Sequence, residues 1–213
     1  MENESNNNFR KDSGRNPWLS IWTEPRATIA RIIQVNPNRG LWWLAAIYGF
    51  SSLLNSFQSV SFGHRIGLLQ IFILALVLSP IWGYLGFSIW SYFVLIAGKL
   101  FGGKGSFKEI RAAYAWSCVP LLFNACLWIV LALCFGNALF MSMPDADPLT
   151  QTQVTILVIV LLVRLVTAIW AIVIYVNTLS EVQKFSVLKT IGTIFVSAIC
   201  VGIIFYLVLL LST

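Results

Sequence analysis

Long apolar runs alternate with short polar segments along this chain. An α-helix rises about 1.5 Å per residue, so about 20 apolar residues cross the roughly 30 Å hydrocarbon core of a bilayer. Runs of this length predict five membrane-spanning helices, at residues 41–60, 67–97, 113–135, 154–176 and 191–211. The pattern therefore predicts an all-α, polytopic membrane bundle that occupies residues 40–211.

Three of these runs have features that shape the expected helices. The run at 67–97 is too long for one upright span, and no polar turn divides it, so we expect one tilted helix that is kinked near Pro80 and extends beyond the bilayer. Pro120 interrupts the third run. The run at 41–60 becomes polar in its second half, which we expect to face other helices rather than lipid.

The segment before the membrane domain divides into two parts. Residues 1–16 are polar and Asn-rich, which predicts a disordered cytoplasmic tail. Residues 17–39 predict an interfacial amphipathic helix, with Thr23 as the N-cap and Pro25 in the first turn. Its apolar face would lie in the lipid headgroup region, with Trp22 as an anchor and Arg26 near phosphates. The alternative is that the same face packs on the rest of the protein.

Basic residues lie almost entirely on one side of the predicted membrane. All but two of the 14 Lys and Arg residues fall in segments that share a side with the N-terminus: Arg10, Lys11, Arg15, Arg26, Arg31, Arg39, Lys99, Lys104, Lys108, Arg111, Lys184 and Lys189. The exceptions are Arg65, in an outer loop, and Arg164, within a span. The positive-inside rule then predicts a cytoplasmic N-terminus and an external C-terminus.

Composition supports the membrane assignment and excludes other classes. Hydrophobic residues make up 58% of the chain and charged residues only 10%, whereas soluble domains carry about 25% charged residues. The net charge is +6, but no basic stripe alternates with aromatics, so nucleic-acid binding is not expected. The four cysteines lie in apolar runs, where we expect them to be buried as small hydrophobic residues rather than to bind metal.

Motifs for catalysis or cofactor binding are missing from the sequence. The stretch GKLFGGKG at residues 98–105 imitates a phosphate-binding loop, but Gly105 stands where Ser or Thr must bind magnesium. His64 is the only histidine and has no acid beside it, and no pair of carboxylates falls inside a span. The sequence therefore predicts no enzymatic activity and no cofactor.

Arg164 requires an explanation, because it falls near the middle of the fourth predicted span. A centred arginine costs about 2.5 to 3.5 kcal/mol on insertion scales. The possible partners are carbonyls freed by Pro80 or Pro120, a bound lipid phosphate, or the polar side chains of Asn55, Tyr84 and Asn124. Two hypotheses remain open: an arginine that joins the bundle by hydrogen bonds, and an intramembrane anion or lipid site.

Two short stretches resemble the Yip-domain membrane proteins, the family of Rab-GTPase-interacting proteins and their bacterial relatives. The first is IWTEPRATI at residues 21–29, followed by Asn-Pro before the first span, and the second is FKEIRAAYAWSCVP at residues 107–120. The residues that carry the resemblance are Pro25, Arg26, Pro37, Tyr114 and Pro120. The resemblance covers residues 18–211, and the order of five spans with an inside N-terminus agrees with it.

The resemblance implies a role in membrane organisation. Eukaryotic members bind lipidated Rab GTPases and carry a longer cytosolic arm with an Asp-Leu-Tyr-Gly-Pro motif, which this sequence lacks, so the bacterial-type branch and a bacterial cytoplasmic membrane are favoured. We expect a non-enzymatic scaffold of partners or lipid, with anionic headgroups at its basic face and other membrane proteins or further copies as partners. The alternative is a small transporter or lipid translocator with a path near Arg164.

Overall fold

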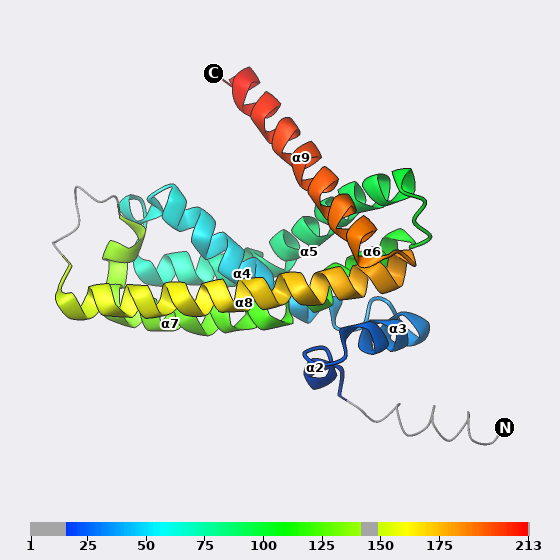
Figure 1. The fold of residues 1–213 in the computed structure, drawn as a ribbon. Helices are drawn as coiled ribbons and strands as arrows, with labels where there is room; N and C mark the ends of the chain where they lie inside the picture. The colour runs from blue at the N-terminus through cyan, green and yellow to red at the C-terminus, as the bar shows by residue number, and fades with distance from the viewer. Residues whose placement is uncertain (1–15, 142–148, 213) are drawn as a thin grey trace.

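The structure, a computed structural model, describes residues 16–141 and 149–212 (Figure 1). The predicted tail, apart from Asn16, and the polar turn at residues 143–148 lie outside the described residues. Within these ranges every regular element is helical. The elements are α2 (Pro17–Ser20), α3 (Pro25–Val35), α4 (Leu41–Ser59), η1 (Phe62–His64), α5 (Leu68–Leu100), α6 (Phe107–Ser117), η2 (Val119–Leu122), α7 (Phe123–Phe135), η3 (Gly136–Phe140), α8 (Gln151–Gln183) and α9 (Val187–Ser212).

Four described helical segments are long and apolar enough to cross a membrane: Leu68–Leu100, Val119–Phe140, Gln151–Gln183 and Val187–Val208. The first predicted span, at residues 41–60, corresponds to α4, which forms the expected helix but is not among the four. Its polar second half explains this outcome, because the side chains that follow Phe50 include Ser51, Ser52 and Asn55. The structure thus supports several spans, and a count of five stays a prediction.

α4 and α5 cross at very short range, because both helices have small residues at the crossing. A Cβ atom added to Gly49 would lie 2.1 Å from the carbonyl oxygen of Ser79, and one added to Gly83 would lie 1.9 Å from the carbonyl oxygen of Ala45. Small residues spaced four apart allow helix backbones to approach closely in membranes. Gly49 and Gly83 therefore fix how these helices pack.

α5 is a single helix that continues through Pro80. Proline has no N–H group, so the carbonyl of Leu76 lacks its usual intrahelical partner. The hydroxyl of Ser79 donates a hydrogen bond to that carbonyl at 2.8 Å. The carbonyl freed by Pro80 is therefore bonded within α5 and is not available to Arg164.

The third predicted span begins later than the sequence pattern indicated. The backbone N–H of Ser106 donates to the carboxylate of Glu109 at 2.7 Å, a bond typical of a capping box at the start of α6. α6 ends at Ser117, and a 3₁₀ turn that contains Pro120 precedes α7. Most of α6 is buried in protein, and the apolar segment long enough to cross a membrane starts at Val119.

Two separate helices, α2 and α3, replace the single helix predicted at residues 17–39, and the N-cap of α3 is Glu24 rather than Thr23. Ile29 and Ile32 are fully buried in a core cluster with residues of α6 and α8. Trp22 lies 6.2 Å from the ring of Phe123, centroid to centroid. The apolar face thus packs on protein, as the alternative hypothesis predicted, and its position in a headgroup region stays a prediction.

α9 leaves the bundle at an angle, and its C-terminal part stands away from the other helices (Figure 1). Its first half packs against α5, with Thr190, Thr193 and Ser197 fully buried. The second half exposes apolar side chains, among them Ile203 and Phe205. Exposed apolar faces this long need lipid or another apolar surface around them.

The cysteine prediction holds for only part of the set. Cys118 is buried, and Cys134 is partly buried, but Cys126 and Cys200 are exposed on the apolar surface. A small thiol is weakly polar, so lipid can surround it as readily as protein can. The described residues contain no group of three or more His, Cys, Asp or Glu side chains that could bind a metal ion.

Candidate functional site: a polar groove and two arginines

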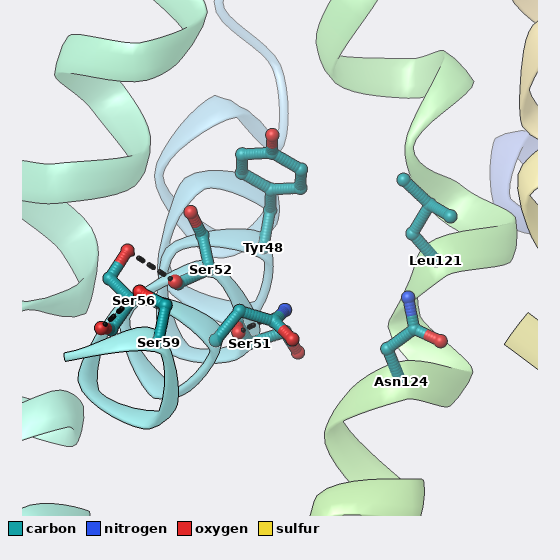
Figure 2. Close-up of a pocket in the computed structure, with 8 residues that line it drawn as sticks. Tyr48, Ser51, Ser52, Ser56, Ser59, Leu121 and Asn124 are labelled. Atoms are coloured by element: carbon teal, nitrogen blue, oxygen red, sulfur yellow. Dashed lines mark hydrogen bonds between the residues drawn. The ribbon is translucent and has the colours of Figure 1, made fainter. Parts of the chain in front are cut away.

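A groove lies between α4 and α7, with a cavity volume of about 350 Å³ (Figure 2). We call it the α4–α7 groove, and its lining residues are Tyr48, Ser51, Ser52, Asn55, Ser56, Ser59, Leu121 and Asn124. All but Leu121 carry a hydroxyl or an amide, and none is charged. Figure 2 shows the serines on one side and Asn124 with Leu121 across from them. The groove therefore offers neutral hydrogen-bonding groups between apolar helices.

Several side chains of the groove donate hydrogen bonds to the backbone of α4, the helix that carries them. The Asn55 amide donates to the carbonyl of Ser51 at 2.8 Å, and the Ser56 hydroxyl donates to the carbonyl of Ser52 at 3.0 Å. The Ser52 hydroxyl accepts from the indole N–H of Trp82 at 3.2 Å. The amide oxygen of Asn55 and the hydroxyl oxygens keep free acceptor capacity, because each such oxygen has two lone pairs.

Two groove atoms are buried without a hydrogen-bond partner among the described residues: Oγ of Ser51 and Oδ1 of Asn124. A buried polar atom without a partner costs about 1 to 3 kcal/mol. Water or a polar ligand in the groove would remove this cost. The sequence predicted that this half of α4 would face other helices. Ser51 is buried and Gln58 donates to the carbonyl of Leu139 as that prediction requires, whereas Asn55 and Ser59 are exposed at the groove.

Arg164 does not lie in the groove. Its guanidinium carbon lies 5.0 Å from the centroid of the buried Trp128 ring of α7. Within the described residues Nε and Nη2 of Arg164 are buried without a hydrogen-bond partner, and so is the indole nitrogen of Trp128. The Asn124 side chain starts one helical turn from Trp128, about 6 Å along α7. α7 thus places the groove and Arg164 close to each other.

Two of the other polar groups considered as partners of Arg164 form hydrogen bonds with other residues. Asn55 bonds to the backbone of its own helix, and Tyr84 accepts a hydrogen bond from Arg111. A cation–π contact contributes about 0.5 to 2 kcal/mol. This amount is smaller than the roughly 2.5 to 3.5 kcal/mol that insertion of an arginine costs. Both hypotheses for Arg164, an arginine that joins the bundle by hydrogen bonds and an intramembrane anion or lipid site, stay predictions.

Arg111 is the buried cation that the sequence reasoning missed. Only 6% of its surface is exposed. Nη1 donates to the Tyr84 hydroxyl at 2.7 Å, and Nη2 donates to the Asn38 side-chain oxygen at 3.1 Å. Its guanidinium carbon lies 4.8 Å from the Tyr84 ring centroid and 5.2 Å from that of Phe107. Arg111 therefore ties the linker before α4 to α5 and α6.

A helical pattern in the sequence could have indicated this burial. Phe107, Arg111 and Tyr114 are spaced four and three apart, so they share one face of α6. The positive-inside pattern alone places Arg111 among the cytoplasmic charges. A basic residue between two aromatic residues on one helix face indicates a guanidinium held against rings.

The residues that carried the family resemblance have structural roles in several places. Pro25 begins α3, and Pro37 belongs to the turn before α4. Tyr114 stands among aromatic rings, 5.5 Å from Phe87 and 5.1 Å from Tyr175. The remaining two are Arg26, whose Nε donates to Asn177 at 3.1 Å, and Pro120, which is buried in η2.

The Gly-rich stretch at residues 98–105 encloses a side chain of α8. The N–H of Gly105 donates to Oε1 of Gln183 at 3.3 Å, and the N–H of Lys104 donates to the carbonyl of Gln183 at 3.3 Å. A Cβ at Gly98 or Gly103 would lie 2.2 or 2.1 Å from the Gln183 amide. These glycines make room for Gln183, which explains the motif without a phosphate.

Long apolar helices with apolar outer faces, broken by few polar groups, define an integral membrane protein of several spans. The family model of the Yip1 domain matches residues 19–211. The chain therefore belongs to the Yip1-domain family. No curated protein and no solved structure matches it.

Proposed function

We propose that this protein is a non-enzymatic scaffold that organises partners or lipid at a bacterial cytoplasmic membrane through a basic cytoplasmic surface. The observation that carries the proposal is the contact between the Gly-rich stretch and Gln183. It brings together two basic connections that are about 80 residues apart in sequence. We call the result the basic surface, formed by the exposed side chains of Lys99, Lys104, Lys108, Lys184 and Lys189.

Charge on the basic surface is mostly uncompensated. Among the described residues its one ion pair joins Lys184 to Glu181, at 2.5 Å. Juxtamembrane Lys and Arg residues each contribute about 1 kcal/mol to attraction by anionic leaflets. The basic surface therefore suits anionic headgroups or an acidic face of another membrane protein.

We propose five spans, with α4 as the first, the N-terminus in the cytoplasm and the C-terminus outside. α4 is 19 residues long, which corresponds to about 28 Å of helix and matches a hydrocarbon core. Its close crossing with α5 supports a place inside the bundle. A reporter attached after residue 213 tests the count, because a cytoplasmic signal from that end would contradict five spans.

A lipid translocator is the second candidate, and the α4–α7 groove favours it. The groove follows α4 from Tyr48 to Ser59, about 16 Å along the helix axis, which is half of a hydrocarbon core. Neutral oxygens along a membrane helix could solvate a lipid headgroup. Because the groove covers only half of the hydrocarbon core, it does not form a complete path across the membrane, and we therefore prefer the scaffold.

Reconstitution distinguishes the two functions. Purified protein is placed in liposomes that carry a fluorescent lipid, and the rate at which the lipid changes leaflet is measured. The scaffold predicts the rate of empty liposomes. A faster rate that falls to this baseline in both Arg164→Leu and Asn124→Leu would reject the scaffold in favour of the translocator. Leu133→Ala, at an exposed apolar site of α7, is the matched control.

A further inference from the structure

The two unpaired polar atoms of the α4–α7 groove show which groups an occupant must bring. Ser51 of α4 and Asn124 of α7 line the groove from opposite sides (Figure 2). Only 6% of Ser51 is exposed, and its hydroxyl has no hydrogen-bond partner in the described part of the chain, nor has Oδ1 of Asn124. A hydroxyl both donates and accepts, whereas an amide oxygen only accepts. Hydroxyl groups of a ligand would therefore suit both positions.

The charge of the lining selects against an ionic occupant. None of the lining residues carries a charge, and Arg164 is not among them. A phosphate or an ammonium that entered the groove would lose its hydration without gaining an opposite charge. An uncharged group loses far less on leaving water, and hydrogen bonds to the lining can replace those it gave up. The groove therefore favours a neutral group that is rich in hydroxyls.

The size of the groove and the surface of α7 indicate that this group is attached to a lipid. The cavity of about 350 Å³ is at the lower end of the roughly 300 to 1,000 Å³ typical of ligand sites, so it suits a headgroup rather than long acyl chains. The exposed side chains of α7 include Phe123, Ile129 and Leu133, which are apolar. Acyl chains of a lipid held in the groove would lie against this surface.

We propose that the α4–α7 groove binds the uncharged, hydroxyl-rich headgroup of a lipid, such as a sugar linked to diacylglycerol. Hydroxyls of the headgroup bond to Ser51 and Asn124, the exposed amide of Asn55 contacts the headgroup at the edge of the groove, and the acyl chains follow α7. This inference goes beyond the proposed function, because the basic surface of the scaffold attracts charged groups and the groove holds neutral ones.

The experiment uses the full chain, stripped of lipid in a detergent without a sugar headgroup and then mixed with one lipid at a time. The lipids are monoglucosyl diacylglycerol, diacylglycerol and phosphatidic acid with the same acyl chains, and native mass spectrometry measures how much of each stays bound. The basic surface can also hold phosphatidic acid, so binding in the groove is measured as the retention that Leu121→Trp removes.

Leu121→Trp fills the groove from the α7 side and leaves every existing polar and charged group in place. It should abolish retention of the glucosyl lipid and leave that of phosphatidic acid unchanged. Ser51→Ala and Asn124→Leu should each weaken retention of the glucosyl lipid about fivefold, because each removes a neutral hydrogen bond. Thr155→Val is the matched control, since the exposed Thr155 hydroxyl donates to the carbonyl of Gln151 in its own helix, outside the groove.

Thermal unfolding of the lipid-free protein separates a binding role of Ser51 from a structural one. Ser51→Ala removes a buried hydroxyl without a partner, so it should leave the midpoint unchanged or raise it, and a lower midpoint would overturn the proposal.

Several results of the retention measurement would also overturn the proposal. They are native retention of the glucosyl lipid in both Ser51→Ala and Asn124→Leu, equal retention of diacylglycerol in the groove, and a loss of phosphatidic acid in Leu121→Trp as large as that of the glucosyl lipid. Displacement by free glucose at equal concentration would show a soluble ligand instead, and no groove-dependent retention of any lipid would leave water as the occupant. Failure of the scaffold would appear as lipid transfer in liposomes, which lipid retention does not report.

Discussion

Replacement of Gly83 by alanine tests how the membrane domain holds together. The added Cβ would lie 1.9 Å from the carbonyl oxygen of Ala45, where ordinary contact begins at 3.4 Å. The α4 and α5 backbones must therefore separate by more than 1 Å, since neither atom belongs to a movable side chain. Overpacking of this kind costs about 1 to 3 kcal/mol, and the higher helix propensity of alanine returns about 1 kcal/mol. Because both backbones must move, we expect the upper end of the overpacking cost and therefore a net loss of about 2 kcal/mol.

Gly86 is the matched control for this prediction. It lies on α5 one turn from Gly83, and a Cβ there would meet no atom within 4 Å. Gly86→Ala should leave stability unchanged or raise it by up to about 1 kcal/mol. The measurement is thermal unfolding of both purified variants in the same detergent, followed by circular dichroism. Equal midpoints for the two variants would show that the α4–α5 crossing does not contribute to stability as argued.

Three further changes test the buried polar contacts. Arg111→Gln should lower stability by about 2 kcal/mol in thermal unfolding, because hydrogen bonds of a charged donor are lost, and an unchanged midpoint would contradict the role of Arg111. A double-mutant cycle of Arg164→Leu, Trp128→Leu and the double variant should show a coupling free energy of about 0.5 to 2 kcal/mol between the two side chains. Additive effects of the two single changes would exclude the cation–π contact. Gly103→Ala pushes mainly on the movable Gln183 amide, so it should cost only about 1 kcal/mol, less than Gly83→Ala; a larger loss would refute this ordering.

Local patterns in the sequence were sufficient to predict the helices. The apolar runs indicated α5 and α9 within four residues at each end, whereas α8 extends seven residues beyond the predicted end of its span; the pattern Ser106-Phe-Lys-Glu109 is also typical of a helix start, which is where α6 begins. Both signals depend only on neighbours along the chain. The break at Pro120 was visible as well, but the sequence alone could not show that α6 is buried in protein, because that depends on what packs around it.

Contacts between distant helices could not be predicted in the same way. Gly83 and Gly49 are ordinary small residues in apolar runs until their partners, Ala45 and Ser79, are known. The same holds for the glycines around Gln183, which imitate a nucleotide motif in sequence. A glycine required by close approach cannot be distinguished from one required by a turn without the opposing atom.

The two arginines inside the fold show where the sequence argument succeeded and where it failed. The cost of inserting a charge into a membrane drew attention to Arg164, whose contact with the Trp128 ring supplies at most about 2 of the roughly 3 kcal/mol required. The same argument overlooked Arg111, whose hydrogen bonds to Tyr84 and Asn38 satisfy much of its guanidinium. A satisfied arginine stabilises one arrangement of helices, whereas an unsatisfied one leaves free energy that water, lipid or a partner can supply. Nε of Arg111 is also buried without a hydrogen-bond partner among the described residues, so the two arginines differ in degree, and a ligand site at Arg164 stays a prediction that lipid transfer in the Arg164→Leu variant tests.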